Sequence, residues 1–162
     1  MAKTEIDIAD WKGAMGYFPA GVTIITTWNG SAPIASTVSS FCSVSLAPPL
    51  LLFCLDQNNP ILGPVKNSGR IGVNILDAQG GAAAFHFSKP GQNSVFGDYP
   101  YKTTDDGAPQ LEAAPCFVDC TVEDTHLAGD HTIIVGKGVA IRKNTGAPVL
   151  IYHQGKFLNT GE

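Results

Sequence analysis

The most informative stretch of the sequence is STVSSFCSVS at residues 36–45, which runs through LAPP at residues 46–49 into an apolar stretch over residues 50–55. Seven of these ten residues carry a small hydroxyl or thiol side chain. Because a buried hydroxyl is costly unless a partner satisfies it, a strand or tight loop of this composition suits a polar ligand lying close to the backbone. A phosphate or a polyhydroxyl chain fits best, since both accept hydrogen bonds from hydroxyls and successive backbone N–H groups. An edge strand with a hydroxyl-rich solvent face explains the composition equally well.

The overall composition predicts one ordinary globular domain over residues 1–162, because 44% of the residues are hydrophobic and 15% are charged. The formal net charge of −4 provides no basic surface, so we expect no nucleic-acid partner. No apolar run reaches the roughly 20 residues of a membrane span, and residues 1–4, MAKT, lack the apolar core of a signal peptide. We therefore expect a cytoplasmic protein with no membrane contact and with its four cysteines reduced.

The periodicity of apolar residues predicts a β-rich chain with a few helices. An amphipathic helix should follow a capping box at Thr4 and Asp7, because positions 8, 11, 15 and 18 are apolar. Asn59-Pro60 should open a short helix through residue 65, and Asp77 should cap an Ala-rich turn over residues 78–87. Strands are expected over residues 21–28, 33–40, 50–55, 71–75, 116–126, 131–143 and 149–152, with turns at 29–30 and 144–146. Many short strands without sustained βα alternation predict a barrel.

One long polar segment separates the two groups of strands. Residues 88–115 are repeatedly interrupted by Gly and Pro. A loop of that length in a compact domain is usually functional, often as a lid. We therefore expect this segment to have a functional role.

The cysteines and histidines allow a zinc hypothesis, with Cys116, Cys120, His126 and His131 as ligands. On a strand, Cys116, Cys120 and His126 share one parity with apolar neighbours, so both cysteines should lie on the apolar face. The CxxxC spacing is unusual for zinc, His131 has the opposite parity, and free cysteine is a common core residue. We therefore expect no metal.

His131 is the histidine with the clearest context, because Gly129-Asp130-His131 opens a strand. Ile133 and Val135 share its face, as do positions 139 and 141, so His131 should sit at the rim of the barrel with its ring aimed at the mouth. There it could touch a ligand or cap the core, with Asp130 holding its tautomer. His86 and His153 have no pattern around them and are expected at the surface or in satisfied positions.

Five short motifs together resemble those of the short-chain, NAD(P)H-dependent flavin reductases, the flavin-reductase-like split-barrel family. They are FPAGVT at residues 18–23, TVSSF at 37–41 with SVS at 43–45 and PPL at 48–50, GVNIL at 72–76, FHFS at 85–88 and GDH at 129–131. Each motif is weak alone, but their common order over residues 14–157 makes the resemblance specific.

The resemblance implies a mainly β fold, a β-barrel with a few helices known as the FMN-binding split barrel, working as a homodimer with flavin near the subunit interface. It implies hydride transfer from NADH or NADPH to FMN or FAD. The reduced flavin would then pass to a flavin-dependent monooxygenase. Such chemistry needs no general base, because the reaction takes place between two cofactor rings and the protein supplies positioning.

The resemblance also assigns site residues. His131 would position the nicotinamide, without acting as an acid or base. Asp56 and Asn59 would meet the ribityl or adenosine portion of the flavin. The main flavin contacts would be Thr37, Val38, Ser39, Ser40, Ser43, Val44 and Ser45, and the phosphate side would be Phe85, Ser88 and Lys89, with Lys89 supplying the positive charge. Ala20 stands where the family more often has Thr or Ser, and Asn58-Asn59 replaces a more usual Ser-containing stretch.

Three alternatives compete with this interpretation. A split barrel can hold flavin or haem without turning over nicotinamide, because fold alone does not fix function. A pyridoxamine-phosphate oxidase on a related barrel would need more phosphate-binding basic residues than the 10 Lys and Arg present. A purely structural module would leave residues 36–45 unexplained.

Overall fold

The structure is a computed structural model, and it describes residues 5–103, 106–144 and 148–160. Its helices are α1 (Ile8–Gly16), α2 (Leu62–Ser68) and α3 (Gly81–Ser88), with a 3-10 turn η1 (Ala78–Gly80) before α3. Its strands are β1 (Ala20–Gly21), β2 (Thr23–Asn29), β3 (Ala32–Val38), β4 (Phe41–Leu46), β5 (Pro49–Asp56), β6 (Arg70–Ile75), β7 (Tyr101–Lys102), β8 (Gln110–Leu111), β9 (Cys116–Ala128), β10 (His131–Lys143), β11 (Leu150–His153) and β12 (Lys156–Asn159).

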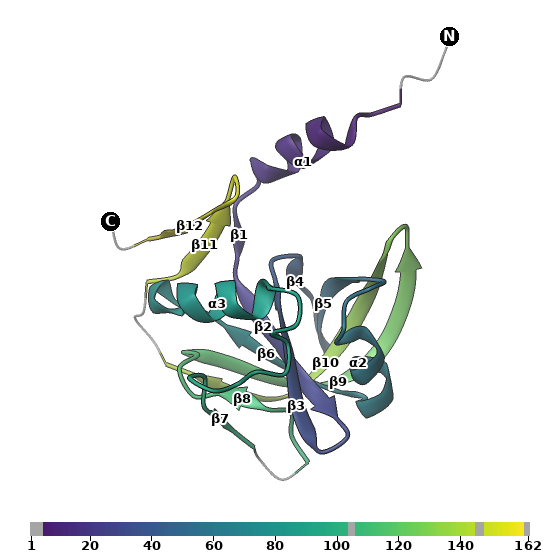
Figure 1. Cartoon of the computed structure of the whole chain (residues 1–162). Coiled ribbons are helices and arrows are strands. Elements are labelled where there is room, and N and C mark those ends of the chain that lie inside the picture. Colours follow the sequence, from purple (N-terminus) through teal and green to yellow (C-terminus); the bar gives the residue numbers. More distant parts are fainter. Residues whose placement is uncertain (1–4, 104–105, 145–147, 161–162) are drawn as a thin grey trace.

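Seven strands form one antiparallel sheet in the order β3-β2-β6-β9-β10-β5-β4 (Figure 1). The sheet curls on itself, because one buried cluster joins Ile25 and Val38 at one end of that order to Phe53 and Ile134 near the other. Helix α2 contributes Val65 to the same interior. Such β-branched and aromatic residues suit the pleated surface of a strand. The mainly β barrel predicted from the sequence is confirmed.

A second apolar layer covers the outside of the barrel between the sheet and α3. Phe87 of α3 packs there with Phe96 and Leu111, both from the long segment that precedes β9. The backbone of Ala35 bonds that segment twice, accepting from Asn93 Nδ2 at 2.7 Å and donating to the Asn93 carbonyl at 2.7 Å. The described part of residues 88–115 therefore packs as part of this layer, and a functional role for the segment stays a prediction.

The hydroxyl-rich stretch divides into a corner and an edge strand. The chain leaves β3 at Val38, turns at Ser39 and Ser40, and enters β4. Strand β4 pairs only with β5 and lies at one edge of the sheet, with Cys42 exposed. The sequence did not separate β4 from β3, because small hydroxyl residues run through both strands and the corner.

Strand β10 places His131 on the opposite face from the one predicted. Thr132 and Ile134 are buried, whereas His131 and Ile133 are half-exposed on the other face. The prediction failed because residues 133–135 are all apolar, so their pattern does not fix which face is the core. The prediction that Cys116 and Cys120 lie on the apolar face is partly right, because Cys120 is buried in the barrel but Cys116 is only half-buried. All four cysteines are free thiols.

Helix α1 and the C-terminal hairpin lie together at one end of the molecule (Figure 1). Asp7 caps α1, accepting from the Ala9 and Asp10 N–H groups at 2.8 and 3.2 Å, while Thr4 of the expected capping box lies outside the described residues. No residue of α1 is buried. Strand β1 pairs with β11, which pairs with the unpredicted β12. Residues 145 and 146 of the expected turn also lie outside the described residues.

Among the described residues, no helix has both the length and the apolar character needed to cross a membrane.

Candidate functional site

A continuous cleft runs along the outside of the barrel and is centred on Ser39. Three adjoining hollows of about 890, 350 and 530 Å³ share this residue in their walls. The largest lies against α1, the second against α3, and the third against β4 and β5. The corner between β3 and β4 therefore faces an open site, as the hydroxyl-rich stretch predicts.

The α3 end of the cleft brings together four of the residues expected to contact the flavin. Thr37 and Ser39 line it with Phe85 and Ser88. The Lys89 ammonium lies 4.0 Å from the centre of the Phe85 ring, which places a cation at this end. Two hydroxyls are already engaged, because Thr37 Oγ1 donates to the Ala84 carbonyl at 2.7 Å and Ser88 Oγ donates to the Phe85 carbonyl at 2.9 Å.

The middle of the cleft offers one free hydroxyl. Ser39 Oγ has no hydrogen-bond partner within the part of the chain that the structure describes, and its residue is half-buried. Ser40 Oγ instead holds the edge of β5, bonding both the Cys54 N–H and the Cys54 carbonyl at 3.1 Å. The Val38 side chain belongs to the barrel core and its carbonyl accepts from Thr23 Oγ1 at 2.8 Å. Of residues 37–40, Ser39 is thus the residue best placed to donate to a ligand.

The β4 side of the cleft ends at Cys42, which lines it with Leu52 and Cys54. Ser43, Val44 and Ser45 continue along the edge strand and line none of the three hollows, with Val44 at a register shift opposite β5. A single copy of the chain therefore does not bring these three predicted flavin contacts to the cleft.

The β9–β10 turn presents His131 beside two carboxylates. His131 Nδ1 lies 2.7 Å from Asp130 Oδ1. This hydrogen bond, together with the charge of His131, lowers the pKa of Asp130. The carboxyl group therefore stays ionised at neutral pH, and because a carboxylate only accepts, Nδ1 must donate. Asp56, directly opposite His131 on β5, offers a carboxylate oxygen within 4.8 Å of both groups.

Gln57 fixes this turn from both sides of His131. Its backbone N–H donates to the Asp130 carbonyl at 2.9 Å, and its side-chain Nε2 donates to Thr132 Oγ1 at 2.7 Å. No sequence motif predicted this clamp. Asn59 is also structural, because its Nδ2 donates to Ser36 Oγ at 3.1 Å and its Oδ1 accepts from the Ile61 N–H at 3.1 Å.

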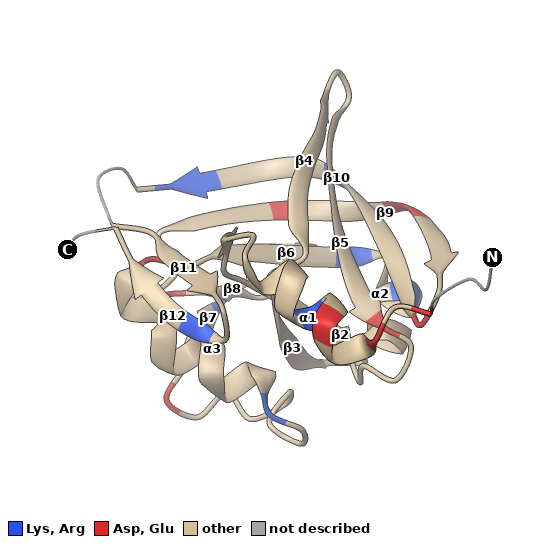
Figure 2. Cartoon of the chain, turned by 90° about the horizontal axis from the view of Figure 1, so that it is seen from above, with Lys and Arg blue, Asp and Glu red and all other residues tan. Residues whose placement is uncertain are grey.

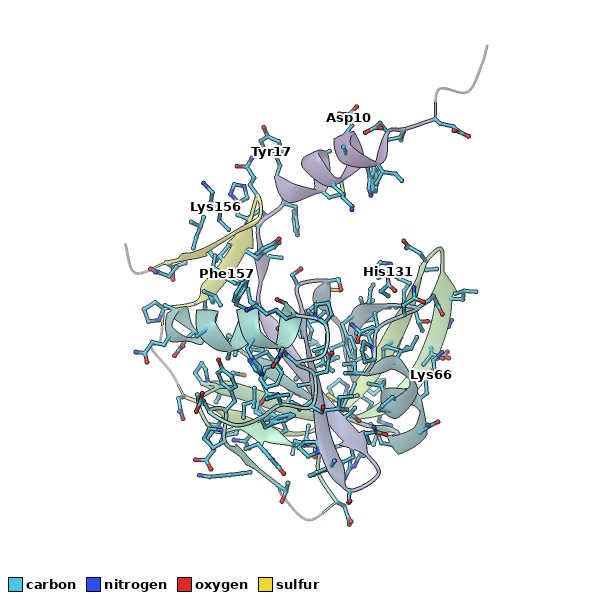
Figure 3. The ribbon with its side chains drawn as sticks, viewed as in Figure 1. Asp10, Tyr17, Lys66, His131, Lys156 and Phe157 are labelled. Carbon is cyan, nitrogen blue, oxygen red and sulfur yellow. The ribbon has the colours of Figure 1, made fainter. Side chains whose placement is uncertain are left out.

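His131 shares a sheet face with the cleft. Cys54 lines the cleft and is paired with Ile133 on β10. His131 precedes Ile133 by two residues, on the same face and roughly 7 Å along the strand. Figure 3 shows His131 below α1, at the side of the barrel that carries the β9–β10 turn.

The described residues do not bring together the four ligands that the zinc hypothesis considered. The group of possible metal ligands that they bring together is Asp56, Asp130 and His131, without a cysteine. Cys120 is enclosed in the barrel, where burial and the neighbouring Asp119 raise the pKa of its thiol to about 12. A protonated, enclosed thiol does not ligate zinc.

Several cleft residues were missed from the sequence. Trp11, Lys12 and Tyr17 line it from α1, and Tyr152 and Phe157 line it from the C-terminal hairpin, with their two rings 5.6 Å apart. The apolar spacing of α1 predicted an amphipathic helix but no part in the site, and β12 was not expected at all. These aromatic residues lie near the two ends of the chain and form no sequence motif. The sequence therefore did not indicate that they belong to one site.

Comparison with known proteins gives a consistent family. Residues 15–161 match the model of the flavin reductase like domain. The flavin reductase (NADPH) of Lentzea aerocolonigenes is 36% identical over 149 residues, covering 90% of this chain and 86% of that protein. A reductase component of 4-nitrophenol 4-monooxygenase/4-nitrocatechol 2-monooxygenase from Rhodococcus opacus is 31% identical, covering 94% of this chain and 80% of that protein.

A solved structure supports the same family. The NADH:FAD oxidoreductase SgcE6 of Streptomyces globisporus C-1027, in complex with NAD and FAD fragments, is 28% identical and superposes with a TM-score of 0.87, covering 96% of each chain. The match of the family model over most of the chain and the shared barrel confirm what the five sequence motifs predicted. This chain belongs to the flavin reductase-like family and has its split-barrel fold.

Proposed function

We propose that this chain catalyses hydride transfer from a reduced nicotinamide to FMN or FAD in the cleft centred on Ser39. Membership of the family makes the chain an NAD(P)H-dependent flavin reductase. The observation that carries the assignment to this cleft is its continuity from Phe85 and Ser88 to the Cys54 face, which His131 shares. A cleft of this kind can hold two flat rings in contact.

The residues of the cleft suit a flavin. A flavin carries a phosphate, a polyhydroxyl ribityl chain and a ring with polar edges. The free Ser39 Oγ can donate to a polar group at the middle of the cleft, and the Lys89 ammonium can pair with a phosphate at the α3 end. Flavin supplies the two-electron acceptor for the hydride, so the chain need only position the two rings.

His131 is proposed to orient the nicotinamide. Its Nδ1 is committed to Asp130, so in the neutral ring Nε2 is left as an acceptor. That nitrogen can accept a hydrogen bond from the carboxamide N–H of nicotinamide, which fixes the rotation of the ring. The Gln57 clamp keeps the turn in place, and no proton transfer by His131 is required.

The reduced flavin is proposed to leave for a flavin-dependent monooxygenase, since a relative is the reductase component of such a system.

We also propose a homodimer, because Leu46, Val139 and Ile141 are 95%, 51% and 70% exposed on β4 and β10. Exposed apolar patches of this kind mark interaction surfaces. A cytoplasmic location is proposed from the free thiols, which oxidising compartments would pair.

The test is the loss of NADH or NADPH absorbance with purified protein, measured with and without added FMN or FAD. Rapid oxidation that depends on added flavin is the expected result, and it ranks both flavins and both nicotinamides. A flavin absorbance band on the protein without any oxidation would instead favour the competing function of a flavin-binding protein that does not reduce its ligand.

A further inference from the structure

Helix α1 forms one wall of the largest hollow of the cleft without being part of the core. Trp11 and Tyr17 are 53% and 72% exposed, and both face a hollow whose opposite wall includes Ser39 and Ser40. The helix is fixed at its C-terminal end, where the Gly16 carbonyl accepts from the Gln154 N–H at 3.0 Å. Aromatic side chains exposed on such a wall offer a surface on which a flat ligand ring can stack.

The charge of this wall comes from Lys12. Among the described residues that line the three hollows, Lys12 is the only lysine or arginine, and none is acidic. Figure 2 shows a basic and an acidic band side by side on α1, and Figure 3 shows Asp10 on the side of the helix away from the barrel. The cleft wall of α1 is therefore positive.

Lys12 is near enough to the turn that carries His131 for its charge to help lower the pKa of Asp130, although the hydrogen bond from His131 contributes most and Lys12 contributes least. The other cation of the site, Lys89, lies beside Phe85 at the α3 end. The cleft thus has one cation near the proposed nicotinamide end and another near the proposed flavin phosphate.

We propose that Lys12 binds the diphosphate of the reduced nicotinamide dinucleotide, with Trp11 and Tyr17 providing the surface on which its adenine stacks. This inference rests on the proposed function, because it places the second half of a ligand whose nicotinamide lies at His131. A lysine ammonium pairs with phosphate as a point charge, and adenine stacks on any aromatic face. The hollow of about 890 Å³ lies within the range of ligand pockets.

The test compares three variants by steady-state kinetics and by calorimetric titration with NADH and with ADP-ribose, which lacks the nicotinamide. Lys12→Ala should raise the KM for NADH and the Kd for both ligands about tenfold, the effect of one lost charge-assisted hydrogen bond. Lys12→Arg should keep them within about twofold, since the charge remains. The matched control is Lys66→Ala on α2, which Figure 3 shows on the flank of the molecule, below His131 and farther from α1.

Salt gives an independent readout. The KM of the wild-type protein for NADH should rise with ionic strength, because salt screens an exposed charge pair, and this dependence should flatten in Lys12→Ala. An unchanged Kd for ADP-ribose in Lys12→Ala would overturn the inference. A raised Kd for flavin with an unchanged Kd for ADP-ribose would overturn it too, by assigning Lys12 to the flavin phosphate. A wild-type protein that binds ADP-ribose through Lys12 but oxidises no NADH would refute the proposed function alone.

Discussion

His131 and Asp130 form a pair in which only one ring nitrogen remains for a ligand. His131→Ala removes that acceptor, so we expect the KM for the nicotinamide to rise about tenfold, which corresponds to about 1.4 kcal/mol. The Kd for flavin should not change, because the flavin contacts lie around Ser39. Steady-state kinetics measures the KM for the nicotinamide, and flavin titration measures the Kd for flavin.

His126→Ala is the matched control, because His126 is also exposed, sits on the neighbouring strand and pairs with a carboxylate, Asp124, at 3.2 Å. It should leave both constants unchanged. Equal KM values for His131→Ala and the wild-type protein would contradict the proposed contact between His131 and the nicotinamide.

Because of Cys120, the free energy of unfolding should depend on pH in the alkaline range. Burial, followed by the charge of Asp119, raises the pKa of its thiol from 9.0 to about 12 in the folded protein. The folded state therefore holds the proton more tightly than the unfolded state, and the contribution is complete below pH 9. Between about pH 9 and 12 the free energy of unfolding should fall by about 1.4 kcal/mol per pH unit from this group.

Denaturant unfolding from pH 8 to pH 10.5 measures this effect. The wild-type protein and Cys116→Ala should share the slope, whereas Cys120→Ala should lack it despite a lower stability overall. Parallel pH curves for all three proteins would show that Cys120 ionises in the folded state as easily as in the unfolded state.

At the scale of elements, Asn74 joins β2, β6 and β8. Its side chain is fully buried, with Nδ2 donating to the Ile24 carbonyl at 3.0 Å and Oδ1 accepting from the Leu111 N–H at 2.8 Å. Asn74→Ala leaves the Leu111 N–H without its acceptor, so it should destabilise the fold by about 3 kcal/mol. In urea, the midpoint should fall while the m-value stays unchanged.

The control for this substitution is Asn67→Ala on the exposed side of α2, which should change stability by less than about 0.5 kcal/mol. If Asn74→Ala kept the urea midpoint of the wild-type protein, the apolar layer between the sheet and α3 would not depend on this hydrogen bond.

Elements with one apolar face and clear turn residues were predictable, whereas elements on a two-sided apolar surface were not. The β2–β3 hairpin turns at Gly30, whose φ of 64° matches the expected Asn-Gly turn. Helix α2 ends at Gly69, also with a positive φ of 65°, as expected from Ser68-Gly69. Which face of β10 is buried could not be predicted, because both of its faces are apolar. The contribution of residues 88–115 to the apolar layer beside α3 could not be predicted either, since their buried residues are isolated in a polar segment.

For the whole molecule, the exposed apolar side chains on β4 and β10 predict that two copies associate. Ile141→Lys should convert the dimer to a monomer, because a charge buried without a partner opposes association. Light scattering after size-exclusion chromatography measures the mass. Val95→Lys changes an equally apolar, 46% exposed residue beside α3 and should leave the dimer intact. A wild-type monomer at micromolar concentration would contradict the prediction.

The candidate site was predictable where it follows the family motifs along the chain. Ser39, Phe85 and Ser88 were named from sequence and line one cleft. Ser43–45 do not reach that cleft in one copy, and whether a second copy uses them depends on the proposed dimer. Trp11 and Phe157 were missed because their contribution arises only when the two ends of the chain lie beside Ser39. That residues 1–162 form one domain stays a prediction.

Trp11 also supplies a built-in optical reporter. The chain has two tryptophans, and the other, Trp28 on β2, donates from Nε1 to the Gly107 carbonyl at 2.9 Å and lines none of the three hollows. Replacing Trp28 with Phe would leave a single fluorophore on the cleft wall. Reduced nicotinamide and flavin both absorb where indole emits, so arrival of either ligand would quench that emission through energy transfer. Stopped-flow fluorescence of this single-tryptophan protein would therefore time the filling of the cleft separately from the redox step.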